Sequence, residues 1–292
     1  MSKFVVTTDS CADFFKKDYQ KMDVPYIIIK RVLNGVEVED MYDSEAECNA
    51  FYESLRKGER PTTVALNTQE FEQFWGDILD RTEGDIIHVC LSSGLSLTYD
   101  NAVKAAANLK EKLGKRKIHV IDSLIATWGM GIMVEKLCKM RDEGIDTTEA
   151  VKRAEYTRDR LQGWVAVSDL FHLKRGGRIS GAKAMIGTVL GIKPIIVIAK
   201  NGKLAIQNKM KGVKKAASYL LSKIEEMGGL VDGELRLIYS TKGEVYDEIK
   251  SMIAKTYPKM KVTEGIVGPV IGTHLGSNAV AILFEGIERL DI

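Results

Sequence analysis

The chain has 292 residues, of which 45% are hydrophobic and 28% charged, and its formal net charge is only +2. A chain of this length can bury a full hydrophobic core in one or two domains. The near-neutral charge, without a basic tail or stripe, argues against a nucleic-acid partner. The N-terminus turns polar too early for a signal peptide and Lys193-Pro194 interrupts the longest apolar region, so we expect a cytoplasmic protein without stable membrane insertion.

The first half of the chain alternates short β-branched runs with longer amphipathic stretches. The expected strands are residues 4–6, 86–91, 118–121 and 164–167. The expected helices are residues 70–80, 98–113, 124–143 and 148–162. This alternation predicts a parallel α/β sheet. Residues 26–39 differ, because two apolar runs flank Asn34-Gly35, which is a strong β-hairpin signal.

The pattern changes near residue 160. Residues 194–206 hold two apolar runs around Asn201-Gly202 and predict a second hairpin. The remaining expected elements are strands 235–239, 261–266 and 279–284 and helices 213–227 and 245–257. We therefore expect an α/β protein of two domains. Residues 1–160 would form a parallel-sheet domain with a hairpin insertion near 26–40, and residues 161–292 a mixed or antiparallel α/β domain.

Cysteines and histidines indicate neither disulfides nor a metal. The four cysteines lie far apart without a C-x-x-C motif, which predicts reduced and mostly buried thiols. The four histidines fall in no metal-ligand spacing, so no metal is expected.

Polar side chains follow each strand predicted for the first half. They are Thr7-Thr8-Asp9-Ser10, Ser92-Ser93, Asp122-Ser123 and Ser168-Asp169. Ligands of open parallel sheets bind at the carboxyl ends of the strands, so these residues suit a polar pocket. Helix capping explains the same residue types. For Ser93, which follows a second serine and precedes Gly94, the sequence favours a ligand contact over a cap.

Two further segments are candidates for binding. Arg60-Pro61-Thr62-Thr63 has no strand or helix pattern, and its hydroxyls either contact a ligand or cap the following helix. Lys174, Arg175 and Arg178 surround Gly176-Gly177, a composition that suits either an anion site or a solvated turn opening a helix. The segment lacks the spacing of a P-loop, and a sugar or nucleotide binder is the third interpretation of the chain.

His274 lies in a glycine-rich loop before a strand, and such a histidine is either structural or functional. With Ser93 or Ser96 as nucleophile and Asp122 or Asp169 as acid, it completes the Ser-Asp-His order of α/β-hydrolases. Leu97 replaces the second glycine of the nucleophile elbow, and no HGGG-type loop lies upstream. A serine acyl hydrolase is therefore the alternative function.

Seven segments spread over the whole chain form a combined pattern. They are Thr8-Asp9-Ser10, Pro61-Thr62-Thr63, residues 91–99, Ile121-Asp122-Ser123, residues 173–180, residues 191–195 and residues 273–276. Together and in this order they resemble the DegV family, the fatty-acid-binding subunits of bacterial fatty acid kinase. The Ser-Ser-Gly-Leu-Ser and Arg-Gly-Gly-Arg-Ile-Ser segments are the specific part of the resemblance.

The resemblance implies a long-chain fatty acid in an apolar tunnel and no other cofactor. The carboxylate would be held by Thr62 or Thr63 and by Ser93, with His274 in the same hydrogen-bond network and Ser96 among the ligand-binding residues. A separate kinase subunit would phosphorylate the bound carboxylate with ATP for phospholipid synthesis. This chain would then be a non-catalytic lipid-binding protein and a monomer when free.

The resemblance also gives the cationic segment a use, and the sequence departs from the family at three points. Lys174, Arg175 and Arg178 would stabilise the phosphorylated product or face the kinase subunit. Leu97 brings a bulky side chain to the turn beside the expected head-group site, Val64-Ala65 replace an amide and a proline, and Lys211-Gly212 stand where relatives often carry an arginine. A different acyl preference, or loss of kinase coupling, is the open alternative.

Overall fold

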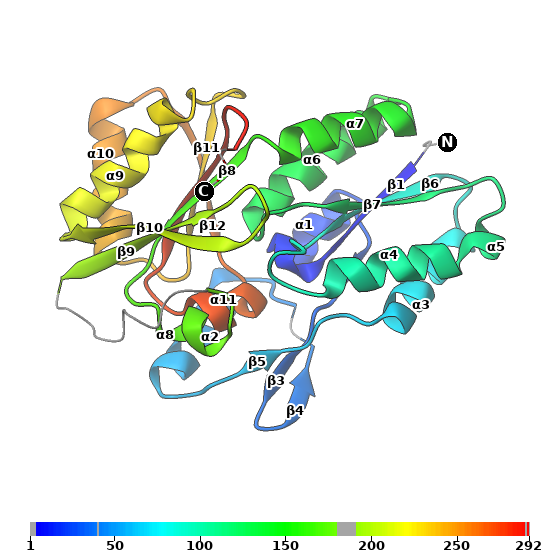
Figure 1. Cartoon of the computed structure of the whole chain (residues 1–292), viewed down its shortest axis with the longest axis horizontal. Coiled ribbons are helices and arrows are strands. Elements are labelled where there is room, and N and C mark those ends of the chain that lie inside the picture. Colours follow the sequence, from blue (N-terminus) through cyan, green and yellow to red (C-terminus); the bar gives the residue numbers. More distant parts are fainter. Residues whose placement is uncertain (1–3, 40, 180–190, 290, 292) are drawn as a thin grey trace.

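The computed structural model describes residues 4–39, 41–179, 191–289 and 291. They form a four-stranded parallel sheet, a six-stranded mixed sheet and a small three-stranded sheet, with helices packed on the two larger sheets (Figure 1). The predicted α/β class, with a parallel N-terminal sheet and a mixed C-terminal sheet, is confirmed. None of the helices among these residues is long and apolar enough to cross a lipid bilayer.

The first sheet is built from the N-terminal half of the chain. In spatial order its parallel strands are β2 (Tyr26–Ile27), β1 (Phe4–Asp9), β6 (Asp85–Cys90) and β7 (Ile118–Asp122). Its main helices are α3 (Thr68–Leu79), α4 (Thr98–Asn108), α6 (Trp128–Asp142) and α7 (Thr147–Arg158). Helices α3 and α4 lie on one side and α6 and α7 on the other (Figure 1). Ile86, Ile87 and Val89 are completely buried because both faces of the sheet are covered.

The second sheet is built from the C-terminal half. In spatial order its strands are β10 (Leu204–Lys211), β9 (Ile192–Ile198), β8 (Leu161–Ala166), β13 (Val280–Glu285), β11 (Glu234–Tyr239) and β12 (Lys261–Ile266). Only β11 and β12 pair in parallel. Helices α9 (Val213–Glu226) and α10 (Glu244–Thr256) pack on one face. The other face packs on the core of the first sheet. Because successive side chains of a strand point to opposite faces, the neighbours Trp164 and Val165 belong to different hydrophobic cores.

The remaining elements are the small third sheet, several further helices and one 3-10 turn. They are β3 (Arg31–Leu33), β4 (Val36–Val38), β5 (Thr62–Thr63), α1 (Lys16–Lys21), α2 (Glu45–Arg56), α5 (Lys110–Leu113), α8 (Phe171–Arg175), α11 (Pro269–Leu275) and a 3-10 turn at Ser10–Ala12. The predicted turn at Asn34-Gly35 joins β3 to β4, and both turn residues have positive φ. All four cysteines are free and buried, as predicted.

Several predicted element boundaries are wrong. The helix expected over 98–113 breaks at Leu109 into α4 and α5, and the helix expected from residue 124 begins at Trp128 because Leu124 and Thr127 take positive φ. Residues 161–162, expected at the end of a helix, begin β8. The expected loops hold two elements: Thr62–Thr63 pairs with β3, and His274 lies on α11.

Candidate functional site

A large apolar cavity lies where the two larger sheets, α11 and β5 meet. Its volume, counted together with its open mouth, is about 860 Å³, and we call it the acyl cavity after the ligand that the resemblance implies. Its walls include Leu91 and Ala126 from the first sheet and its loops, and Val165, Ile198 and Leu283 from the second. The polar side chains that reach it are Thr63, Ser96, Thr127, Arg178 and His274. An apolar cavity with a few polar groups is typical of a site for an amphipathic small molecule.

Thr63 and His274 form a hydrogen bond at the cavity wall. The Thr63 Oγ1 and His274 Nε2 atoms are 2.8 Å apart, although the residues are 211 positions apart in the chain. The contact joins β5 to α11, and it exists because the pairing of β5 with β3 turns Thr63 toward α11. Successive side chains of a strand point to opposite faces. Thr62 accordingly is exposed and does not line the cavity.

The imidazole of His274 is neutral. Burial is the main cause, and the positive charges of Arg178 and Arg175 add to it, so that the pKa of His274 falls to about 4. Its Nδ1 atom is buried without a hydrogen-bond partner among the described residues. A neutral imidazole can accept or donate a hydrogen bond without adding a charge, and the Nδ1 side of this ring faces Gly176.

Gly176 leaves the room that the His274 ring occupies. A Cβ atom at this position would lie 2.1 Å from His274 Nδ1, closer than any side chain allows. Its neighbour Gly177 differs, because it has a φ of +70° and a Cβ atom there would meet no atom of the described residues within 4 Å. The first glycine is thus needed for close packing and the second for backbone conformation.

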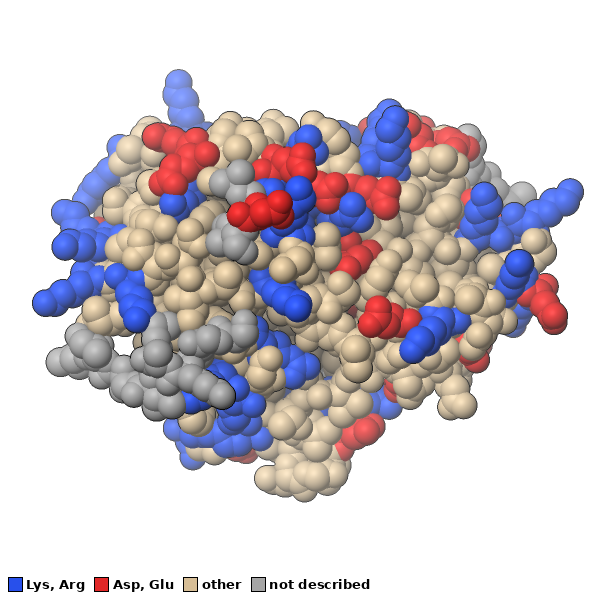
Figure 2. All heavy atoms as spheres, in the orientation of Figure 1, with Lys and Arg blue, Asp and Glu red and all other residues tan. Residues whose placement is uncertain are grey.

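The cationic segment, which contains Lys174, Arg175 and Arg178, lies beside the site at the end of α8 and in the turn that follows. Arg175 donates to the Pro61 carbonyl at 3.0 Å and thereby holds the β5 loop next to α8. Arg178 donates to the Leu95 carbonyl at 3.1 Å and lines the acyl cavity. Lys174 is exposed and, like Arg175, does not line it. On the face shown in Figure 2, lysine and arginine side chains gather over α8 and α2.

The hydroxyls of the turn after β6 have three different environments. Ser92 is fully buried and donates to the Gly202 carbonyl at 2.9 Å, which joins the first sheet to the β9–β10 turn. Ser93 is exposed, does not line the cavity, and donates its backbone N–H to Asp122. Ser96 lines the cavity, and its Oγ lies 2.8 Å from Thr98 Oγ1. Leu97 is 67% exposed and also lies outside the lining.

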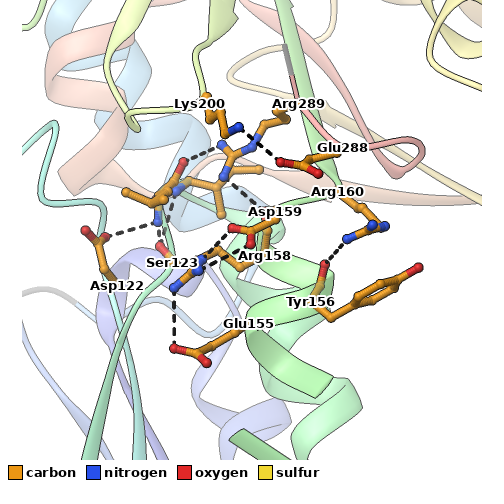
Figure 3. A network of polar contacts seen from close by, with 12 residues as sticks. Asp122, Ser123, Glu155, Tyr156, Arg158, Asp159, Arg160, Lys200, Glu288 and Arg289 are labelled. Atoms are coloured by element: carbon orange, nitrogen blue, oxygen red, sulfur yellow. Dashed lines mark hydrogen bonds and ion pairs between the residues drawn. The ribbon is translucent and has the colours of Figure 1, made fainter. Parts of the chain in front are cut away.

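Asp122 and its surroundings form a junction between the two larger sheets (Figure 3). Asp122 accepts from the Leu124 N–H, and the Leu124 carbonyl accepts from Arg289 at 2.7 Å. Arg289, which is 4% exposed, also donates to the carbonyls of Arg158 and Ala199. This end of the first sheet is therefore occupied by hydrogen bonds that connect the segments next to the two larger sheets.

The structure brings together Thr63, Ser96, Arg178 and His274 out of the predicted site residues. It leaves Thr62, Ser93, Lys174 and Arg175 outside the cavity lining, and Ser180 lies outside the described residues. The partner of His274 is Thr63 and that of Ser96 is Thr98, so within the described residues no serine–histidine pair of a hydrolase is formed.

An apolar tunnel was expected from the resemblance, but the residues of its walls were not named, although a signal for them exists in the sequence. Val165, Ile198 and Leu283 lie on strands in which both faces are hydrophobic, and one of the two faces turns to the cavity. Period-two patterns identify those strands but do not say that the space beside them is empty.

One group of potential metal ligands occurs among the described residues. Ligand atoms of Asp9, His88 and Cys90 all lie within 4.8 Å of one another, at the ends of β1 and β6. The two Asp9 oxygens accept the backbone N–H groups of Leu91 and Cys11, at 2.7 and 2.9 Å. His88 Nδ1 lies 2.9 Å from the Thr7 hydroxyl. Hydrogen bonds thus already account for the carboxylate and for one imidazole nitrogen.

Comparison with known proteins agrees with the fold. The profile of a family described as uncharacterised proteins of the DegV family matches residues 3–286. A DegV domain-containing protein of Clostridium perfringens is 32% identical over 289 residues, which cover 98% of each chain. In Caldanaerobacter subterraneus a DegV domain-containing protein is also 32% identical, covering 98% of this chain and 99% of its own.

A solved structure carries the comparison from sequence to fold. DegV from Bacillus subtilis, described as a fatty acid binding protein, is 27% identical and superimposes with a TM-score of 0.78, covering 98% of this chain and 100% of its own. The family profile, the relatives and this structure agree over nearly the full length. The chain belongs to the DegV family.

Proposed function

We propose that the protein is a cytoplasmic, non-catalytic carrier that binds a long-chain fatty acid in the acyl cavity. The observation that carries this proposal is a cavity of about 860 Å³ with apolar walls and a few polar side chains, Thr63 and His274 among them. The description of the related Bacillus subtilis protein as a fatty acid binding protein supports it.

Burial of the acyl chain supplies the affinity. Each methylene removed from water contributes about 0.8 kcal/mol, so a 16-carbon chain gains roughly 10 kcal/mol before the costs of binding. The walls are apolar where they are formed by Leu91, Val165, Ile198 and Leu283, so these side chains contact the acyl chain without leaving any hydrogen-bonding group unpaired.

Neutral groups hold the carboxylate in this proposal. Thr63 and His274 are the central contacts, and Ser96 lies in the same cavity. Each such hydrogen bond contributes about 1 kcal/mol net. Thr63 is favoured over Thr62 because its side chain lines the cavity. Ser93 is exposed, so its contact with the carboxylate would lie at the outer end of the site. A neutral clamp leaves a carboxylate oxygen free to react.

The carrier presents this carboxylate to a separate kinase subunit. The γ-phosphoryl group of ATP would pass to a carboxylate oxygen, ADP would leave, and the acyl phosphate would enter phospholipid synthesis. Lys174 and Arg175 are exposed next to the site, and Arg178 is one of the residues that line it, which suits contact with a phosphorylated group or an acidic partner. Hydroxylamine trapping of acyl phosphate in the presence of kinase subunit and ATP tests this step.

Mass spectrometry of an organic extract of the freshly purified, native protein tests the proposal as a whole. We expect a long-chain fatty acid in a ratio near one per chain. An extract without lipid, again after incubation with mixed fatty acids, would overturn the proposal. Labelling of Ser93 or Ser96 by a fluorophosphonate probe would instead establish the hydrolase alternative.

A further inference from the structure

Two turns from different halves of the chain meet beside the acyl cavity. One follows β6 and covers residues 92–96, and we call it the head-group turn; the other joins β9 to β10 and covers residues 199–203. Residues in or next to both turns line the acyl cavity, namely Leu95, Ser96, Ile198 and Leu204. The contact between the two turns therefore sets the distance between two walls of the cavity.

Ser92 is the residue through which the two turns are joined. It is completely buried, and its hydroxyl donates to the Gly202 carbonyl at 2.9 Å and accepts the Gly94 N–H at 3.1 Å. Its carbonyl accepts the N–H groups of Leu95 and Ser96, at 3.0 and 3.2 Å, and so closes the head-group turn. The side chain thus fixes the turn to the second sheet, while the backbone of the same residue gives the turn its shape.

Two glycines make this contact possible, because the turns meet backbone to backbone. A Cβ atom at Gly94 would lie 2.5 Å from the Gly202 carbonyl carbon and 2.7 Å from the Lys203 nitrogen. A Cβ atom at Gly202 would lie 2.1 Å from Ser92 Oγ, and the φ of Gly202 is +72°. A side chain at either position would therefore push the turns apart.

The head-group turn is connected to the polar groups of the cavity. Arg178 donates from Nε to the Leu95 carbonyl at 3.1 Å, and it lines the cavity together with Ser96. Arg178 also donates to the carbonyl of Gly176, the residue that packs against the His274 ring. A shift of the head-group turn would thus move the contacts that surround His274.

We propose that Ser92 and Gly202 are positioning residues for the carboxylate of the bound fatty acid, although neither lines the acyl cavity. Together they hold the head-group turn at the distance from the second sheet at which Ser96 and Arg178 line the same cavity as His274. The inference concerns the head group, because the acyl chain contacts apolar walls that other residues form. It rests on the proposed function of the protein as a fatty-acid carrier.

Competition binding of tetradecanoic acid and tetradecan-1-ol to the full-length protein tests the proposal, because the two ligands share an alkyl chain and differ in head group. We expect Ser92→Ala to reduce the preference for the acid over the alcohol at least about fivefold, the effect of about one hydrogen bond at the head group. Its affinity for the alcohol should stay within about twofold of the wild type. Equal weakening of both ligands, or an unchanged preference, would show a purely structural role and overturn the proposal.

Lys203→Ala is the matched control, since its side chain is exposed on the same β9–β10 turn, and it should bind both ligands as the wild type does. Hydrogen exchange of the wild-type protein adds a test that needs no variant. The acid should protect the amides of Gly94 and Gly202 together, and more strongly than the alcohol does; protection of Gly94 alone overturns the proposal. Failure of the wild type to bind either ligand would overturn the carrier function and this inference with it, whereas the other outcomes overturn the inference alone.

Discussion

Thr62 and Thr63 are identical neighbours on β5, yet only Thr63 reaches His274. The difference comes from the alternation of side chains along a strand and from the pairing of β5 with β3. The sequence shows two adjacent hydroxyls, but it does not show which face the strand will turn to α11. That choice is made by the strand with which β5 pairs, much earlier in the chain.

We predict that Thr63→Val weakens fatty-acid binding about five- to tenfold. The change keeps the shape of the side chain and removes one hydrogen-bonding group, which is worth about 1 kcal/mol. Displacement of a fluorescent fatty acid from the purified protein measures the effect. Thr62→Val is the control and should leave the affinity unchanged; an equal loss in both variants would mean that Thr63 has no special role.

His274 should make the folded protein sensitive to mild acid. Its folded-state pKa of about 4 lies below the value of about 6.5 for an exposed histidine, so the unfolded chain binds the proton more tightly. The stability that the neutral ring contributes is complete above pH 6.5 and is lost as the pH falls toward 4. Between pH 7.5 and pH 5 this amounts to about 2 kcal/mol.

Urea unfolding at the two pH values checks this prediction. The free energy of unfolding of the wild type should fall about 2 kcal/mol further than that of His274→Gln, which cannot titrate there. Parallel decreases in the two proteins would show that His274 is not held in a neutral state by its surroundings.

Among the elements, α8 and α11 have to fit closely for the site to exist. Gly176 follows α8, and a methyl group there would occupy the position of the His274 ring. We predict that Gly176→Ala displaces the ring, breaks its bond to Thr63 and lowers fatty-acid retention about tenfold or more. Gly177→Ala meets no atom of the described residues and should cost only about 1 kcal/mol of stability from its positive φ, with retention unchanged. Extraction and quantification of bound lipid from both variants separates these outcomes.

Some elements were predictable and others were missed for identifiable reasons. Strands β1, β6 and β7 carry apolar runs rich in β-branched residues, which is why their positions were predicted closely, whereas β2 was assigned to the hairpin and joins the parallel sheet instead. Helix α2 was missed although Ser44 and Glu47 carry a helix-capping signature, and α11 although Pro269 begins it and Gly276 ends it. Those local signals were available. The pairing of Thr63 with His274 was not, because it depends on the packing of distant segments.

At the scale of the whole molecule, Arg289 connects the C-terminal segment to both large sheets. It donates to the carbonyls of Leu124, Arg158 and Ala199 in a buried position (Figure 3). We predict that Arg289→Ala lowers the free energy of unfolding by about 3 kcal/mol, because buried carbonyls lose their donors.

Lys200→Ala provides the matched comparison in the same network. Lys200 and Glu288 form an ion pair at 3.0 Å, but both side chains are about half exposed. Its loss should cost less than about 1 kcal/mol. Urea unfolding of the two variants measures both values, and a small effect of Arg289→Ala would show that the two sheets are held together elsewhere.

The size of the acyl cavity has a mechanical consequence. Unfolding under hydrostatic pressure is favoured by the elimination of internal empty space, and the enclosed part of the acyl cavity adds to that space. The empty protein should therefore unfold at a lower pressure than one whose cavity is filled by an acyl chain. The pressure at which the protein unfolds therefore reports whether the cavity is filled. Tryptophan fluorescence under pressure measures it without any analysis of the lipid.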